Sequence, residues 1–190
     1  MANLLQIRAL SIAVTASPQR LERFRSLQAS PALSLIQDVK TRWNSTFDML
    51  LRSWVLRQTI QEWLKQERHS NMMRLQLTKT EWHQVAFLIK LLSPFKRWTE
   101  ALSATTGASI HKAWFLYNLI TGHILRLQAS LATKDFEWKH ELIKALDKGF
   151  AKLMEYRGKA TGNAGLIYGL ATVIDPATRL GQFKVSNIPK

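Results

Sequence analysis

Cysteine is absent from this sequence of 190 residues. Its absence excludes disulfides, thiolate zinc sites and cysteine nucleophiles, and it fits a reducing, intracellular compartment. Long apolar runs are also lacking, because Arg8 interrupts the apolar opening and no other stretch is long enough to span a membrane. With 46% hydrophobic residues, the chain can nevertheless build a core, and we expect a folded protein without membrane spans.

Acidic residues are scarce. The chain has 13 Asp and Glu against 27 Lys and Arg, which gives a formal net charge of +14. Such an excess of positive charge favours a polyanionic partner such as nucleic acid, or indicates a basic segment of a larger protein.

The apolar residues that are present recur mostly at helical intervals. This periodicity predicts a mainly α protein, a bundle of long packed helices with at most one short strand near the C-terminus. We expect helices near residues 4–14, from Pro18, over 41–66, from Thr78 past Pro94, from Ile110, and over 135–157. The pair Ser17-Pro18 and the pair Thr78 and Glu81 are predicted helix starts, and residues 66–77 a polar loop.

The predicted organisation is one structural unit in three stretches. Residues 1–37 form a helical lead-in, 38–165 the main helical domain, and 166–190 a C-terminal apolar segment and tail. The run from Leu166 to Ile174 is compatible with a strand or a short buried helix.

Signatures of enzymes are missing. The eight glycines form neither a phosphate loop nor a dinucleotide fingerprint, and the five histidines are not spaced as metal ligands. Asp38 and Asp48 are ten residues apart, and we interpret them as helix-start and solvent-facing charges rather than a metal-binding pair. No serine lies in a nucleophile-elbow context.

Cations beside aromatic rings remain as candidate binding chemistry. Six of the seven tryptophans fall on apolar stripes and are predicted core residues: Trp54, Trp63, Trp82, Trp98, Trp114 and Trp138. Trp43 differs because it precedes the main stripe and has polar neighbours on both sides, among them Arg42. The sequence leaves Trp43 open between a core position and a surface that stacks on exposed bases.

The stretch "DVKTRWNSTFDMLLR" resembles the TRWNST signature of the hAT superfamily of DNA transposases. Later blocks are similar to the same family in the same order, namely "LIKLLSPFKRWTEALS", "SIHKAWFLYNLITGHI", "ALDKGFAKLMEY" and "IYGLATVIDPATRL". The lead-in "RALSIAVTASPQRLERFRSLQ" looks like that of fungal members.

The resemblance implies a place within the transposase. In that family an RNase H-like fold carries three catalytic carboxylates with divalent metal, and a large helical domain is inserted before the last of them. This chain resembles the helical insertion, so no catalytic residue is carried over to it. The family's tryptophan in the Arg-Trp block is implicated in holding a flipped base, which implies this role for Trp43. Arg42, Lys40 and Asn44 complete the implied nucleic-acid-binding set.

We therefore expect a truncated hAT transposase-like protein that binds DNA weakly or non-specifically, is not an enzyme as an isolated chain, and needs no cofactor or metal. A nuclear location follows from the resemblance and the charge. The alternative is a domesticated basic helical module that binds an acidic protein partner. Whether the chain is a monomer or a homo-oligomer stays open.

Overall fold

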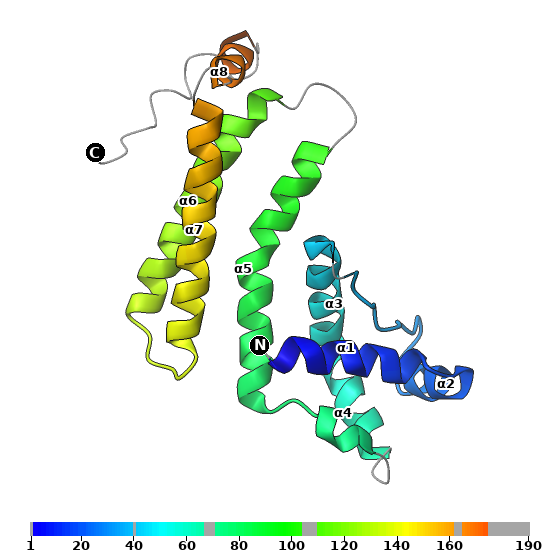
Figure 1. Cartoon of the computed structure of the whole chain (residues 1–190). Coiled ribbons are helices and arrows are strands. Elements are labelled where there is room, and N and C mark those ends of the chain that lie inside the picture. Colours follow the sequence, from blue (N-terminus) through cyan, green and yellow to red (C-terminus); the bar gives the residue numbers. More distant parts are fainter. Residues whose placement is uncertain (1, 40, 67–70, 104–109, 162–164, 175–190) are drawn as a thin grey trace. The chain divides into compact units, whose positions relative to one another are not determined.

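The computed structural model describes residues 2–39, 41–66, 71–103, 110–161 and 165–174 (Figure 1). Regular structure within these ranges is entirely helical, which confirms the predicted mainly α class. The elements are α1 (Ala2–Thr15), α2 (Pro18–Ser26), α3 (Trp43–Val55), α4 (Arg57–Gln66), the 3-10 helix η1 (Asn71–Leu75), α5 (Lys79–Ser103), α6 (Ile110–Ala132), α7 (Lys139–Thr161) and α8 (Gly165–Ile174).

The chain divides into two compact units, unit 1 over Met1–Lys96 and unit 2 over Arg97–Lys190. The division falls within α5, so each unit holds one part of that helix. The stretch 38–165, which the sequence suggested as one domain, contributes to both units.

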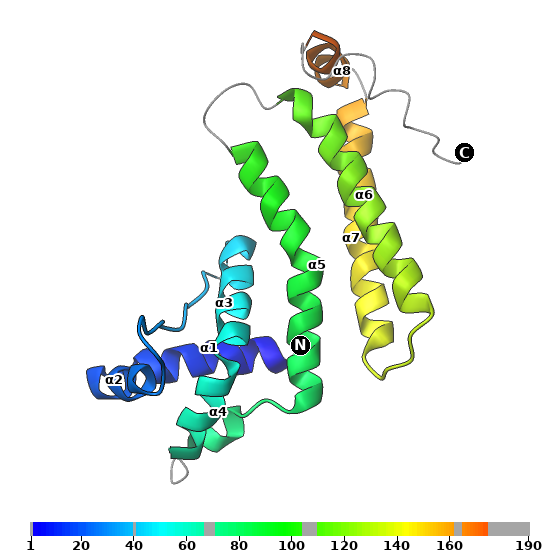
Figure 2. The same cartoon turned by 180° about the vertical axis from the view of Figure 1, so that it is seen from behind.

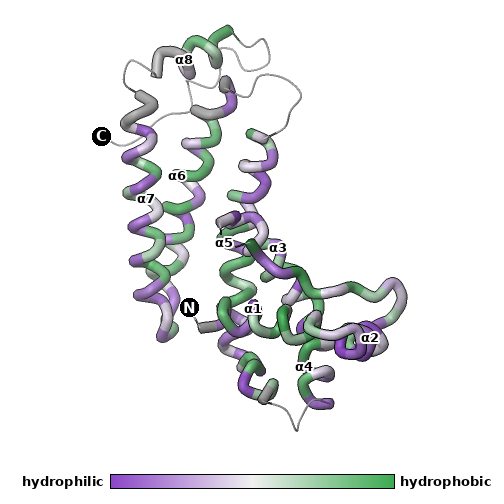
Figure 3. The backbone as a smooth tube through the Cα atoms, turned by 45° about the vertical axis from the view of Figure 1, so that its right-hand side comes forward, coloured by the Kyte–Doolittle hydropathy of each residue, from purple (hydrophilic) through white to green (hydrophobic). Residues whose placement is uncertain are grey.

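Unit 1 begins with a helix that is apolar around most of its circumference. Figure 3 shows α1 as mostly hydrophobic and α2 as mostly hydrophilic. On α1, Ile7, Leu10 and Val14 are fully or almost fully buried, whereas Leu5 and Ile12 are exposed. The predicted start of α2 is confirmed: the Ser17 hydroxyl accepts a hydrogen bond from the Arg20 amide at 3.3 Å, with Pro18 in the first turn.

The single helix expected over residues 41–66 is instead two helices, α3 and α4, separated at Leu56. The Arg57 guanidinium donates to the carbonyl of Trp54 at 3.0 Å and lies 4.5 Å from the centre of its indole ring. It thereby satisfies a carbonyl at the end of α3. Leu56 is buried at this corner, so the break places a further apolar side chain in the core.

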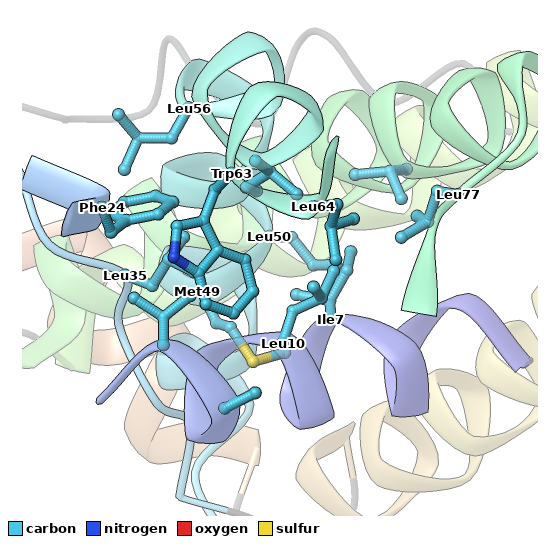
Figure 4. Close-up of a cluster of buried hydrophobic side chains, with 14 of the residues drawn as sticks. Ile7, Leu10, Phe24, Leu35, Met49, Leu50, Leu56, Trp63, Leu64 and Leu77 are labelled. Carbon is cyan, nitrogen blue, oxygen red and sulfur yellow. The ribbon is translucent and has the colours of Figure 1, made fainter. Parts of the chain in front are cut away.

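The core of unit 1 is formed between α1, α2, α3, α4 and the start of α5 (Figure 4). Trp63 is fully buried and meets Phe24 edge to face at 6.4 Å between ring centres. The predicted polar loop at 66–77 was wrong in part, because η1 lies within it and Leu77 is buried. Met72 and Leu75 also pack against this core.

The predicted capping box starts α5. The Thr78 amide donates to the Glu81 carboxylate at 2.7 Å, and the Glu81 amide donates to the Thr78 hydroxyl at 3.2 Å. The helix continues through Pro94, and Trp82 and Val85 are its buried residues. Within unit 1, α3 lies beside the first part of α5, as Figures 1 and 2 both show.

Unit 2 contains α6 and α7, which run side by side, and α8, which packs on both (Figure 1). The α7 helix begins at Lys139, later than expected, and Phe136 and Trp138 pair in the turn before it with ring centres 4.2 Å apart. The apolar run from Leu166 to Ile174 is helical, so the strand alternative was wrong. Its mainly apolar sequence gave no period that separated a short buried helix from a strand.

Within the described ranges, no helix combines the length and apolar character that crossing a membrane requires.

Candidate nucleic-acid interface

The candidate interface lies where the connector after α2 enters α3. We call residues 38, 39 and 41–46 the Arg-Trp turn. The Arg42 amide donates to the Val39 carbonyl at 2.8 Å, and the Ser45 amide donates to the Arg42 carbonyl at 3.0 Å. The Ser45 hydroxyl accepts from the Val39 amide at 2.8 Å and lies 2.6 Å from the Arg42 carbonyl. The turn is therefore tied together by its own backbone and by one serine.

Trp43 is the first residue of α3, and 41% of its surface is exposed. Its indole meets Phe95 edge to face, with ring centres 6.4 Å apart and an interplanar angle of 84°. By contrast, Trp63 and Trp82 are buried as predicted, and Trp54, Trp98 and Trp138 are partly buried. The side chain of Trp114 lies outside the described residues. Trp43 thus packs against Phe95 and keeps part of its surface accessible.

The other predicted contacts differ in their placement. Arg42 is exposed at the N-cap position of α3, and its side chain makes no capping hydrogen bond. Asn44 is partly buried, and its Oδ1 is buried without a hydrogen-bond partner among the described residues. Lys40 lies outside the described residues. Arg42 and Trp43 are therefore both exposed at the start of α3, whereas the side-chain oxygen of Asn44 is buried.

Asp38 differs from the solvent-facing charge that the sequence suggested. Its side chain is only 4% exposed and binds the Arg8 guanidinium through both oxygens, at 2.8 Å from Nε to Oδ1 and 2.6 Å from Nη2 to Oδ2. The Thr46 hydroxyl donates to Oδ2 at 2.9 Å. These hydrogen bonds, from Arg8 first and Thr46 second, lower the pKa of Asp38 against the opposing effect of burial.

Asp48 is also engaged. The Lys96 ammonium binds its carboxylate and lies 5.6 Å from the centre of the Phe47 ring. Within the described part of the chain, no group of three or more His, Asp or Glu side chains is arranged to hold a metal ion. Both carboxylates of the stretch therefore neutralise particular cations.

The described part of unit 2 carries a second group of cations, the lysines of α7. Lys144 and Lys148 are exposed one turn apart. Lys139 instead donates to the Ala132 carbonyl at 3.0 Å, and Lys152 pairs with Glu155 at 2.8 Å. Of these four lysines, Lys144 and Lys148 are thus exposed in the middle turns, and Lys152 is exposed but paired with an acid.

The comparisons with known proteins bear on both units. Residues 2–91 match the model of the ZBED1 RNase-like helical domain. This match includes the Arg-Trp turn and most of unit 1. Over 182 residues, 95% of the chain, the sequence is 35% identical to the putative transcriptional regulator tpeD of Talaromyces stipitatus. The chain spans about a fifth of that relative's length, 19%. No solved structure matches.

Sequence reasoning missed the Arg8 and Asp38 pair. The two residues are 30 positions apart, and no local pattern links a cation on the first helix to an acid in a connector. The only available signal was that Arg8 interrupts an otherwise apolar helix. A charge at such a position needs a partner when the helix is partly buried.

Proposed function

We propose that this chain is the helical part of an hAT transposase-type protein and that it contacts DNA through the Arg-Trp turn. The match of residues 2–91 to an RNase-like helical domain supports the first statement. The exposed Trp43 beside Arg42 is the observation that carries the second.

The chemistry of these two side chains suits an unpaired base and its phosphate. Trp43 is 41% exposed at the start of a helix, so part of its indole is accessible to a ligand. A planar ring can stack on any base, and a neighbouring guanidinium can bind the phosphate. The turn lies at the positive end of the α3 dipole, which also favours an anion.

The relative adds weaker support from its name. It is described as a transcriptional regulator, which favours a role at DNA and a nuclear location for this chain as well. The net charge of +14 would contribute sequence-independent attraction to phosphates.

We also propose that the chain does not cleave DNA by itself. This view is supported by Asp38 and Asp48, each of which holds a cation of the protein. Incubation of supercoiled DNA with the purified chain and magnesium or manganese should leave it intact. Cleavage that copurifies with the chain and is lost in Asp38→Ala would overturn this part of the proposal.

The main experiment compares Trp43→Ala with Phe115→Ala, an equally exposed aromatic residue of unit 2 at 44%. The probes are a DNA hairpin with unpaired tip bases and a fully paired duplex of equal length. Trp43→Ala should weaken hairpin binding by about fivefold or more, because stacking contributes about 1 to 3 kcal/mol per base. Phe115→Ala should bind as the wild type does. Equal hairpin affinity in all three proteins would refute the stacking role.

A second candidate function is binding of an acidic protein through α7, favoured by exposed Lys144 and Lys148. In that case Lys144→Gln combined with Lys148→Gln should abolish capture of an acidic polypeptide such as polyglutamate. Neither DNA probe should bind the wild type at low salt. Salt-sensitive DNA binding that prefers the hairpin over the duplex would favour the first proposal.

A further inference from the structure

We propose that Asp38 is a positioning residue: through Arg8 and Thr46 it holds the Arg-Trp turn in the shape that presents Trp43 and Arg42 to DNA. This inference rests on the proposed function for its biological meaning. The geometry that carries it consists of three linked contacts within unit 1.

The first contact fixes Asp38 to a helix that is itself anchored. Arg8 binds the carboxylate with three hydrogen bonds between 2.6 and 2.9 Å, which sets both the distance and the orientation of the two planar groups. Arg8 lies on α1 between Ile7 and Leu10, which are 0% and 1% exposed. The guanidinium therefore projects from a backbone that the core holds in place.

The second contact joins Asp38 to α3. The Thr46 hydroxyl, in the first turn of that helix, donates to the same carboxylate oxygen that Arg8 Nη2 binds, at 2.9 Å. One carboxylate thus links α1, the connector and the start of α3. Since Trp43 begins α3, the link reaches within three residues of the indole.

The third contact closes the turn around Trp43. Ser45 binds the Val39 amide, and the Arg42 amide binds the Val39 carbonyl. Residues on both sides of Trp43 are consequently held by hydrogen bonds, whereas its side chain remains 41% exposed. A side chain presented by an ordered backbone loses less conformational entropy on binding than one on a mobile loop.

The test uses the full chain with Asp38→Asn, and Thr46→Val as a second variant that keeps the carboxylate and removes one donor. Asp147→Asn is the charge-matched control, an exposed acid of unit 2 that binds Gln128. Each protein is titrated with the unpaired-tip hairpin and the paired duplex.

The expected change in hairpin preference differs from the effect that the altered net charge alone would have. Removing an acid makes the protein more positive, which should tighten binding to both probes. If Asp38 positions the turn, the preference for the hairpin over the duplex should instead fall by about fivefold in Asp38→Asn, the lower limit for one lost stacking contact. Thr46→Val should lower the preference less, and Asp147→Asn should keep it.

A second measurement follows the conformation of the Arg-Trp turn in the absence of DNA. In the chain labelled with 5-fluorotryptophan, the Trp43 resonance is identified by its absence in Trp43→Phe. Asp38→Asn should shift or broaden that resonance and speed hydrogen exchange of the Arg42 and Ser45 amides, while the Trp63 signal stays unchanged as a report of an intact core.

The two proposals fail in different ways. If the wild type shows no preference for the hairpin, the proposed DNA role falls, and the resonance and exchange data still decide whether Asp38 orders the turn. If Asp38→Asn leaves the resonance, the exchange rates and the preference at wild-type values, the positioning role is overturned even where DNA binds. A variant that loses the Trp63 signal has lost the core, and Thr46→Val then decides the positioning role by the same criteria.

Discussion

Single residues determine how the start of α3 is presented. The Asp38 side chain is nearly inaccessible to solvent and binds Arg8 and Thr46, whereas Trp43 is partly accessible. The two unusual exposures lie five positions apart. The hydrogen bonds from Arg8 and Thr46 compensate the buried acid, whereas the exposed part of the indole stays in contact with water.

The pH dependence of the free energy of unfolding should reveal the contribution of Asp38 to stability. Its folded-state pKa is lowered by Arg8 and Thr46, so the pair stabilises the fold fully above the unfolded pKa of about 4. That stabilisation is lost as pH falls through the lowered pKa. Asp38→Asn should therefore reduce the free energy of unfolding by about 1 to 3 kcal/mol at pH 7. It should also flatten the loss of stability below pH 4. The free energy of unfolding is measured by urea denaturation at several pH values. The same pH dependence in the wild type and in Asp38→Asn would contradict this prediction.

Truncation of two tryptophans of unit 1 should lower the free energy of unfolding by different amounts. Trp63→Ala removes a ring that is 0% exposed and should lower the free energy of unfolding by about 3 to 5 kcal/mol. Trp43→Ala should cost much less, because a large part of that ring is already in water. Chemical denaturation of both variants measures the difference. Equal losses would indicate that Trp43 is a core residue.

The helices differ in how strongly local sequence defines their ends. Helix starts carried by a few neighbouring residues were predicted correctly, at Ser17 and Pro18 and at Thr78 and Glu81, because capping depends on residues three apart. The break at Leu56 was not predicted. Neither glycine nor proline marks it, and the Arg57 contact with Trp54 that accompanies it becomes visible only in three dimensions.

The capping box of α5 offers an element-scale test. Thr78→Ala removes the hydroxyl that accepts the Glu81 amide and should lower the free energy of unfolding by about 1 kcal/mol. Thr80→Ala, two residues later and also exposed, is the matched control and should change stability by less than about 0.5 kcal/mol. If both variants lose the same amount, the reciprocal cap does not stabilise the helix.

At the scale of the whole molecule, the apolar periodicity predicted the class of fold and composition gave the sign of the charge, but neither predicted the contacts around the candidate site. The helical periods and the +14 charge are properties of the sequence itself. The site depends on contacts between segments far apart in sequence: Arg8 with Asp38, Lys96 with Asp48 and Phe95 with Trp43. The sequence singled out Trp43 by its polar neighbours, and the residues that hold its surroundings became visible only in the fold.

The salt dependence of DNA affinity should separate the contribution of the overall charge from that of the Arg-Trp turn. DNA affinity of the wild type should fall steeply between 50 and 200 mM salt, with a slope set by the number of phosphate contacts. Arg42→Gln should reduce the magnitude of that slope by about one, because one contact is lost. An unchanged slope in Arg42→Gln would mean that other residues make the phosphate contacts. Lys144→Gln, in unit 2, is the variant for comparison.

The position of Arg8 on α1 has a practical consequence for the design of shortened versions of the chain. A shortened version that begins at the TRWNST block would contain every residue of the motif, yet it would lack Arg8 and the Ile7, Leu10 and Val14 side chains that fill the core. The motif therefore does not define a portable segment. Unit 1 runs from α1 to Lys96 and contains both Arg8 and Phe95, so the surroundings of a motif of six residues come from a scaffold of nearly a hundred.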